Sequence, residues 1–327
     1  MTFPQRRLRR MRRTPAIRRL VAETNLTVDD LVAPLFVREG ITEPQPIVSL
    51  PGVVQHTVDS LLAEATTLAE AGVPALMLFG VPLHKDAEGS EAWNPEGIVQ
   101  VALRRCRAEL GDRMVLMADL CVDEYTDHGH CGILDTRGEV DNDATLDLYA
   151  QAALAQAEAG ADVVAPSGMM DGQVMVIRDA LDSEEHTGVS ILAYAAKYAS
   201  SLYGPFRDAV DVSIVGGGDR KGYQQDWRNA REALEEIRFD LGEGADMVMI
   251  KPALAYLDIV ARARAEVDAP LAAYHVSGEY AMLKAAAANG WIDGDVAAIE
   301  ILTAIKRAGA DFILTYLAGE VAARLGR

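Results

Sequence analysis

The sequence predicts an α/β protein folded as a closed (β/α)8 TIM barrel, preceded by an extended basic N-terminal arm. A short apolar run recurs eight times, and helical patterns separate most of these runs. Short, continuous apolar runs are typical of parallel strands that are buried on both faces, and strand–helix alternation favours a barrel. The runs are Leu31–Val37, Ala75–Phe79, Met114–Leu120, Val163–Ala165, Val189–Tyr194, Met247–Ile250, Pro270–Val276 and Phe312–Leu314.

A short recurring sequence motif that contains a glycine marks where helices are expected to end. Gly72, Gly160, Gly244 and Gly309 each follow a helical stretch and precede an apolar run. A glycine can adopt the left-handed conformation that ends a helix. The alternative is a doubly wound open sheet, which usually has a glycine-rich turn after its first strand, and residues 36–40 do not form one. The helices expected are Val58–Ala71, Asp147–Ala159, Arg228–Leu241 and Ala297–Ala308.

The composition is that of a soluble globular protein, with 50% hydrophobic and 24% charged residues. No apolar run approaches the roughly 20 residues of a membrane helix, and no apolar stretch follows the N-terminal arginines as in a secretory signal. The odd set Cys106, Cys121 and Cys131 argues against a disulfide framework and leaves metal binding or buried thiols. We therefore expect a cytoplasmic protein.

Charge separates an arm, residues 1–25, from a catalytic domain, residues 26–327. Residues 1–20 hold eight arginines and no acid, so a net charge of −18 leaves −26 for the remainder. Such an arm can bind nucleic acid, or it can lie on an acidic surface of its own or a neighbouring subunit. We favour the second interpretation and expect no nucleic-acid partner, because a field from −26 repels phosphate. A transit peptide is a third alternative, although the segment has little serine.

Two lysines are the candidate nucleophiles. The active site of a barrel lies at the C-terminal ends of its strands, where Lys197 and Lys251 are expected. The chain has only six lysines, and lysine is the cation that loses its proton readily enough to attack a carbonyl. An apolar wall and a second ammonium lower the pKa of an amine such as Lys251. The alternative is a lysine paired with a buried carboxylate. Asp119, Ser167, Ser277 and Tyr316 are expected at the same mouth.

A long connection at about residues 203–226 is expected to form a lid, because long irregular segments in compact domains are usually functional. Its glycines at 216–218 lack the spacing of a phosphate-binding loop and indicate flexibility instead. Arg207, Arg220 and Lys221 on this segment can grip a carboxylate, although each alone is more often a solvated charge. The substrate class expected is a small carbonyl compound with at least one carboxylate.

The loop after the third strand is the candidate metal site. Cys121, Asp123 and Cys131 lie on a glycine-containing loop and can bind zinc with an open fourth position. Thiolates favour zinc, whereas the harder carboxylate weakens that preference. His128 and His130 are either further ligands or polar loop residues.

Several stretches together resemble the delta-aminolevulinic acid dehydratase family, also called the porphobilinogen synthases, along essentially the whole chain. The resemblance implies that two molecules of 5-aminolevulinate are condensed to porphobilinogen, with loss of two waters, in tetrapyrrole (heme) biosynthesis. It also implies a homo-octamer, or a hexamer, in which the arm wraps a neighbouring barrel. The stretches are 6–16, 32–39, 119–132, 141–145, 165–173, 197–207, 218–224, 249–258, 274–282 and 305–311.

The resemblance also implies roles for individual residues. Lys251 matches the lysine that binds the first substrate molecule, and Lys197 matches the lysine that binds the second. Asp119 and Ser167 match polar residues beside the amines. The other substrate-binding matches are Arg207, Arg220, Gln224 and the adjacent Lys221 for the second molecule, Ser277 and Tyr316 for the first, and Tyr203, Phe206 and Tyr274 within the matching stretches.

The chain departs from the family at the metal. Zinc-dependent members carry three cysteines in this loop, and zinc-independent members carry aspartate or alanine, whereas this chain has Cys121, Asp123 and Cys131. We favour a weaker zinc site over catalysis without metal at this loop. Glu236 matches a glutamate that holds an allosteric magnesium at a subunit interface. A class I aldolase-type barrel is the rival enzyme, but it needs only one reactive lysine and does not explain the cysteine loop.

Overall fold

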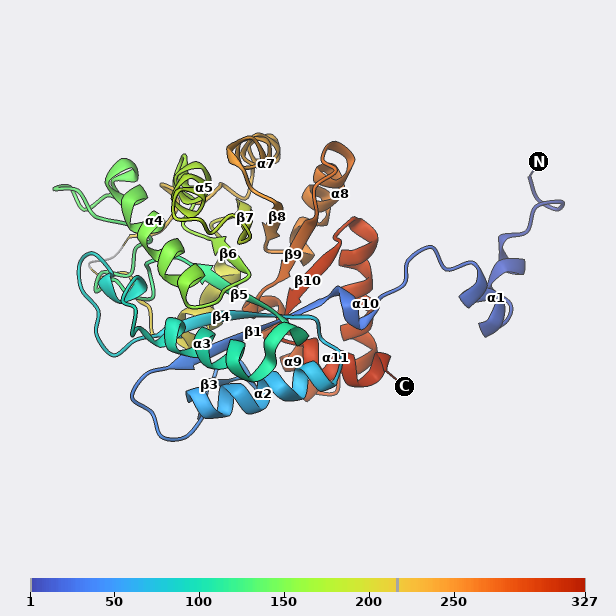
Figure 1. Ribbon diagram of the computed structural model, residues 1–327. Helices are drawn as coiled ribbons and strands as arrows, with labels where there is room; N and C mark the ends of the chain where they lie inside the picture. The colour runs from blue at the N-terminus through green and yellow to red at the C-terminus, as the bar shows by residue number, and fades with distance from the viewer. Residues whose placement is uncertain (1, 216–217, 327) are drawn as a thin grey trace.

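A computed structural model describes residues 2–215 and 218–326. Eight parallel strands form a closed barrel, because the last strand pairs with the first, Leu31 opposite Ile313. The predicted fold and all eight strands are confirmed (Figure 1). The barrel strands are β1 (Leu31–Arg38), β4 (Ala75–Val81), β5 (Val115–Leu120), β6 (Val163–Pro166), β7 (Ser190–Lys197), β8 (Met247–Lys251), β9 (Leu271–His275) and β10 (Phe312–Thr315).

Helices cover the outside of the barrel, as Figure 1 shows. The four helices predicted from the sequence are present with shifted ends. Two of them begin earlier than predicted, because Asp141 and Asp293 cap their first turns with side-chain hydrogen bonds. The helices are α2 (Val58–Glu70), α3 (Ile98–Leu110), α4 (Asn142–Glu158), α5 (Gln173–Ser183), α7 (Arg231–Glu243), α8 (Leu257–Glu266), α9 (Ser277–Ala288), α10 (Gly294–Ala308) and α11 (Ala318–Leu325).

The glycines of the recurring motif end their helices as predicted. Gly72, Gly160, Gly244 and Gly309 have φ angles of 86°, 99°, 109° and 126°. Side chains rarely adopt these angles, so glycine at these positions lets the chain turn from each helix into the following strand. These glycines therefore mark the turn from helix to strand in four of the eight β/α units.

A small hairpin was not predicted. It consists of β2 (Gln45–Pro46) and β3 (Val54–His56), and β3 extends the sheet beside the end of β1. Two- and three-residue strands are too short to produce a recognisable alternation of apolar and polar residues. The hairpin places Gln55 at the rim of the barrel.

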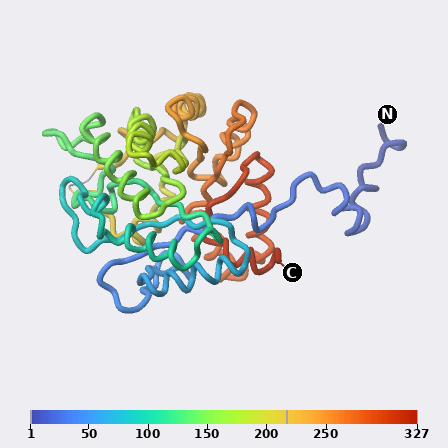
Figure 2. Tube along the Cα trace, in the orientation of Figure 1, coloured from blue at the N-terminus to red at the C-terminus, as the bar shows by residue number. Residues whose placement is uncertain are grey.

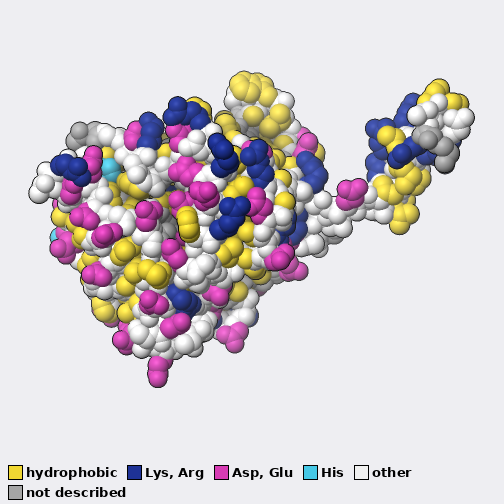
Figure 3. Space-filling view, turned by 90° about the horizontal axis from the view of Figure 1, so that it is seen from above, with side chains coloured by type: hydrophobic (Ala, Val, Ile, Leu, Met, Phe, Trp, Pro, Cys, Tyr) yellow, Lys and Arg dark blue, Asp and Glu magenta, His cyan; other side chains and the backbone are white. Residues whose placement is uncertain are grey.

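The arm stands apart from the barrel. It contains a 3-10 turn, Leu8–Arg12, and the helix α1 (Pro15–Leu20), which begins at the capping residue Thr14. Figures 1 and 2 show α1 at the end of an extended segment, and Figure 3 shows its arginines away from the barrel surface. Leu20 is 84% exposed. Within the described residues, no helix is long and apolar enough to cross a membrane.

The expected lid segment begins with ordered structure rather than an irregular loop. A 3-10 turn, Ser201–Tyr203, leads directly into the helix α6 (Gly204–Ala209), in whose first turn Pro205 lies. Proline suits the first turn because its nitrogen needs no hydrogen-bond partner there. Of the three glycines to which we attributed flexibility, those at 216 and 217 lie outside the described residues.

Candidate active site

The two candidate lysines are neighbours at one mouth of the barrel. Lys197 is the last residue of β7, Lys251 is the last residue of β8, and the two are register partners. Neighbouring strands lie about 4.8 Å apart, and side chains at paired positions point to the same face. Both lysines are buried, at 4% and 5% exposure. Pairing of β7 with β8 therefore brings two buried amines together at the mouth of the barrel.

Aromatic rings surround the amine of Lys251. Its Nζ lies 4.6 Å from the ring centre of Tyr274 and 5.0 Å from those of Tyr194 and Phe206, with Tyr203 at 5.3 Å. Burial, together with the nearby ammonium of another lysine, lowers the pKa of Lys251 to about 7, and nearby carboxylates only partly oppose this. A substantial neutral fraction at neutral pH makes it a nucleophile.

The environment of Lys197 is more polar. Its amine donates a hydrogen bond to the carbonyl oxygen of Ser167. Burial lowers the pKa of Lys197, but negative charge at Cys131, Cys121 and Asp123 outweighs it, and the net pKa is raised. The two amines therefore differ, with Lys251 the more readily deprotonated.

Carboxyl groups lie beside the amines. Asp119 in β5 accepts a hydrogen bond from the hydroxyl of Ser167 at 3.1 Å, and burial raises its pKa although both lysines oppose this. Glu124, 3% exposed, lines the same cavity, and burial raises its pKa well above the usual value. We did not predict Glu124 or the ring of Tyr194. Glu124 directly follows a candidate ligand, whereas Tyr194 lies inside an apolar run that indicated only a strand.

The cations of the lid segment divide into two groups. Arg207 and Arg220 line the cavity that contains both lysines. Lys221 is exposed, pairs with Asp219 at 2.6 Å, and lines an outer groove between the lid segment and α7. Gln224 is buried and also borders that groove. The structure therefore places two of these four residues in the cavity and two in the separate outer groove.

The residues predicted to bind the first substrate molecule, Ser277 and Tyr316, form hydrogen bonds with residues close to Lys251. The hydroxyl of Ser277 accepts a hydrogen bond from the backbone of Phe206 at 3.0 Å and donates to the carbonyl of Leu202 at 3.2 Å. The hydroxyls of Tyr274 and Tyr316 lie 3.1 Å apart. Ser277 thus ties the start of α6 to the mouth of the barrel, and the tyrosine pair lies next to Lys251.

The cavity around the lysines is small. Its volume is about 20 Å³, space for about one water molecule. Phe206 and Arg207 of α6 and Arg220 farther along the lid segment form part of its lining, so the segment covers the lysines. A substrate molecule reaches the amines only when this cover or its side chains move.

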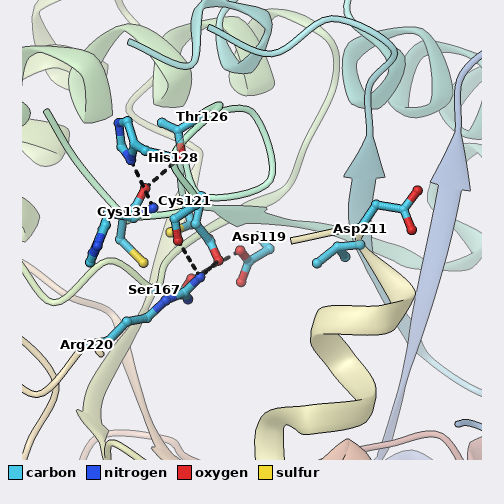
Figure 4. A network of polar contacts seen from close by, with 12 residues as sticks. Asp119, Cys121, Thr126, His128, Cys131, Ser167, Asp211 and Arg220 are labelled. Atoms are coloured by element: carbon cyan, nitrogen blue, oxygen red, sulfur yellow. Dashed lines mark hydrogen bonds and ion pairs between the residues drawn. The ribbon is translucent and has the colours of Figure 1, made fainter. Parts of the chain in front are cut away.

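A cluster of three potential metal ligands adjoins Lys197. One ligand atom each from Cys121, Asp123 and Cys131 lies within 4.8 Å of the others, and all three residues are buried. Asp123 also pairs with Arg220 at 2.7 Å, which outweighs burial and lowers the pKa of the Asp123 carboxyl. Figure 4 shows Arg220 beside Cys121 and Cys131. Two thiols and an ionised carboxylate at this spacing fit a zinc ion, with Arg220 competing for the carboxylate.

The histidines of the loop have other partners. A ring nitrogen of His128 lies 3.2 Å from the carbonyl of Ala87, and His130 lies 3.2 Å from the hydroxyl of Tyr223. Neither joins the cysteine cluster in the described part of the chain. Tyr149 of α4 anchors the loop, because its hydroxyl donates a hydrogen bond of 3.0 Å to the carbonyl oxygen of Cys131.

Glu236 lies on α7, in the outer groove rather than the lysine cavity. Burial raises its pKa to about 7, and the neighbouring carboxylates of Asp171, Glu232 and Glu243 contribute. In residues 2–215 and 218–326, only the cysteine cluster brings three potential ligands together. Among the described residues, Glu236 therefore has acidic neighbours but no complete ligand set.

Comparison with known proteins agrees with this geometry. A family model described as delta-aminolevulinic acid dehydratase matches residues 5–324. The Streptomyces coelicolor delta-aminolevulinic acid dehydratase is 60% identical over 326 residues, 99% of this chain and 98% of that protein. The Mycobacterium tuberculosis H37Rv protein of the same name is 59% identical over 323 residues, 98% of each chain.

A solved structure has the same fold. It is the delta-aminolevulinic acid dehydratase (porphobilinogen synthase) of Toxoplasma gondii ME49, in complex with the reaction product porphobilinogen. The TM-score is 0.96 at 44% sequence identity, and the match covers 98% of this chain and 91% of that chain. The chain therefore belongs to the delta-aminolevulinic acid dehydratase family, the lyases of porphyrin biosynthesis.

Proposed function

We propose that the chain condenses two molecules of 5-aminolevulinate to porphobilinogen, with Lys251 and Lys197 each forming a Schiff base with one molecule. The observation that carries this proposal is the register pairing of the two lysines at the ends of β7 and β8. A barrel that uses one imine needs one such lysine, whereas joining two ketones through imines needs two amines at one mouth. The proposal places the first molecule on Lys251 and the second on Lys197.

The chemistry follows from the state of each amine. Neutral Lys251 attacks the ketone carbon of the first molecule, and loss of water leaves an imine. Each imine draws electrons from the adjacent carbon, so a proton there can be removed and a carbon–carbon bond can form. Asp119, Ser167 and Glu124 are the groups near the amines that can accept or return protons. Formation of the two imines releases two waters. Elimination of one lysine amine, and displacement of the other by a substrate amino group that forms the ring carbon–nitrogen bond, then free both lysines without further loss of water.

The carboxylates of the two molecules require separate cations or hydrogen-bond donors. Arg207 and Arg220, which line the lysine cavity, are proposed to hold the carboxylate of the second molecule with paired hydrogen bonds, and Gln224 and Lys221, which line the outer groove, are proposed to assist them. Ser277 and Tyr316, with Tyr274 beside them, are proposed to hold the first molecule. Tyr203 and Phe206 close the apolar wall above Lys251.

Borohydride reduction in the presence of 5-aminolevulinate, followed by peptide mass mapping, tests this assignment. We expect label on the peptides that contain Lys251 and Lys197, and none on Lys284, which pairs with Glu320 on the outer surface. Lys251→Arg should abolish product formation while leaving label at Lys197. Label on neither lysine of the wild-type protein would defeat the proposal.

A zinc ion is proposed at Cys121, Asp123 and Cys131, with a fourth position left for substrate. When bound there, it would act as a Lewis acid on a substrate group and add positive charge beside Lys197. Equilibrium dialysis should show zinc binding that Cys121→Ser weakens. Chelation followed by zinc or magnesium addition tests the requirement, and full activity without bound zinc would favour catalysis without metal at this loop.

An allosteric magnesium at Glu236 is a separate proposal. Glu236 faces other carboxylates in the outer groove, and a divalent cation would offset their repulsion. Activity should rise with magnesium in the wild type, and this response should disappear in Glu236→Ala. An unchanged response would contradict the assignment.

The arm is proposed to contact a neighbouring subunit of an octamer or hexamer. Its supporting features are its separation from its own barrel and its eight arginines on an otherwise acidic protein (Figure 3). A cytoplasmic location is proposed from the three cysteines, which are buried and unpaired with one another as in a reducing compartment.

A further inference from the structure

The end of α6 is fastened to the rim of the barrel by three side chains. Arg38, the last residue of β1, pairs with the carboxylate of Asp211 and also donates to the side-chain oxygen of Gln55 at 3.0 Å. The amide nitrogen of Gln55 donates to the carbonyl of Ala209 at 2.7 Å. Lys85 donates to the carbonyl of Asp211 at 2.9 Å. Three segments remote from α6 in sequence therefore converge on its C-terminal end.

The backbone conformation of Asp211 depends on these surrounding contacts. Asp211 has a φ of 51°, in the left-handed region that aspartate tolerates better than most residues. A conformation of this kind persists when surrounding contacts determine it. Gln55 is 5% exposed, so its hydrogen bond to Ala209 is made away from water, and movement of α6 would break that bond while leaving the one to Arg38.

The helix α6 contains the side chains that cover the amine of Lys251. Phe206 of α6 lies 5.0 Å from the amine of Lys251. Its ring packs against Phe36 of β1 at 5.9 Å and Phe79 of β4 at 5.1 Å, measured between ring centres. Arg207, the next residue, lines the lysine cavity. Apolar contacts at the middle of α6 and polar contacts at its end thus hold the same helix over Lys251.

We propose that Arg38, Gln55 and Lys85 form a latch that keeps α6 closed over Lys251 and thereby increases the affinity for substrate. These are positioning residues: they touch the cover and not the reacting atoms, and their role in substrate affinity rests on the proposed function. Because the closed cavity is only about 20 Å³, substrate entry requires an open form. Once the substrate has entered and the cover has closed over it, the latch contacts re-form and stabilise the closed complex relative to the open form, which strengthens apparent binding.

Substitutions at the ion pair test the latch. In Arg38→Ala and in Asp211→Asn we expect the KM for 5-aminolevulinate to rise about fivefold, the upper range for a partly exposed ion pair, with kcat changed less than about twofold. Asparagine keeps the tolerance for the left-handed backbone and removes only the charge. Arg38→Lys, which retains a cation, should recover part of the affinity.

Limited trypsin digestion gives a readout that does not depend on catalysis. Arg207 is exposed but lies within the helix α6, so cleavage after it requires the helix to unwind locally, which release of its C-terminal end favours. The rate of appearance of that fragment, followed by mass spectrometry, should therefore increase in both variants. Lys284→Ala is the matched control. Its ion pair with Glu320 has side-chain exposures of 25% and 48%, against 25% and 49% for Arg38 and Asp211.

The outcomes separate the latch from the function on which it rests. A raised KM together with faster cleavage in both variants, and neither in the control, supports the latch. Unchanged KM and unchanged cleavage in both variants overturn it, while the wild type still forms porphobilinogen. A wild type that forms no porphobilinogen overturns the proposed function instead. If Arg38→Ala fails to fold, Asp211→Asn and Arg38→Lys carry the test.

Discussion

The aromatic cover of Lys251 should control the pH at which this lysine reacts. Phe206→Ala removes one of the four rings around its amine and opens the side of the cavity that faces α6. Water then reaches the amine and favours its charged form, so the pKa should rise. The rate of imine formation at Lys251 should therefore begin to increase at a higher pH than in the wild type.

The size of the effect depends on how much of the shift comes from burial. A pKa of about 7 lies about 3.5 pH units below the ordinary 10.5, equivalent to about 5 kcal/mol; burial is its largest cause, and the ammonium of Lys197 adds to it while nearby carboxylates oppose it. Attraction of the ammonium to a ring contributes about 1 kcal/mol in the opposite direction, so exclusion of water dominates. If the loss of Phe206 restores about a quarter of the difference, the neutral fraction at pH 7 falls from about one half to about one tenth.

The assay is a timed borohydride quench in 5-aminolevulinate across the neutral to alkaline range, with reduced adduct measured on the Lys251 peptide. Phe312→Ala is the control, because Phe312 is also partly buried but lies at the start of β10, at the opposite end of the barrel. A Phe206→Ala protein that remains folded and shows the wild-type midpoint would refute the desolvation argument. A shift in the Phe312→Ala protein would show that the effect is not specific to the cover.

Three further results are expected. Gly168→Ala should lower the free energy of unfolding by about 1–3 kcal/mol in denaturant titration, because its new Cβ would lie 1.8 Å from the hydroxyl of Tyr149, whereas Gly222→Ala meets open space and should change little. Asp123→Cys should tighten zinc binding in equilibrium dialysis, since a thiolate replaces a carboxylate shared with an arginine; equal affinity would contradict this. Deleting residues 1–20 should reduce the assembly seen by light scattering, and an unchanged octamer would count against the arm's role.

Much of the fold could be predicted because its signals are local. A strand buried on both faces reads as an apolar run, and a helix that must turn back towards the sheet ends at a residue able to take a positive φ, as Gly160 and Gly309 do. Helix starts were less well predicted, because Asp141 and Asp293 cap their helices before the alanine-rich pattern begins. The hairpin that contributes Gln55 was missed because its strands are two and three residues long.

The prediction of the site depended on position along each strand. The end of each predicted strand indicates which side chains reach the mouth of the barrel. This was sufficient to place Lys197 and Lys251 there. The lid segment was harder, because nothing local indicates which way its side chains point. Arg220 lies inside the cavity and Lys221, the next residue, lies outside it. Tyr194 was indistinguishable from a core residue until the rings around Lys251 could be seen.

The sequence by itself therefore determined the barrel, the scarcity of lysine and the unusual aspartate of the cysteine loop, since each is a property of residue type or spacing. Only the tertiary structure decided that Asp123 pairs with Arg220 and that Arg38 pairs with Asp211. These pairs join residues about 100 and 170 positions apart. Such contacts depend on how loops fold over the mouth of the barrel, and no periodicity along the chain encodes that arrangement.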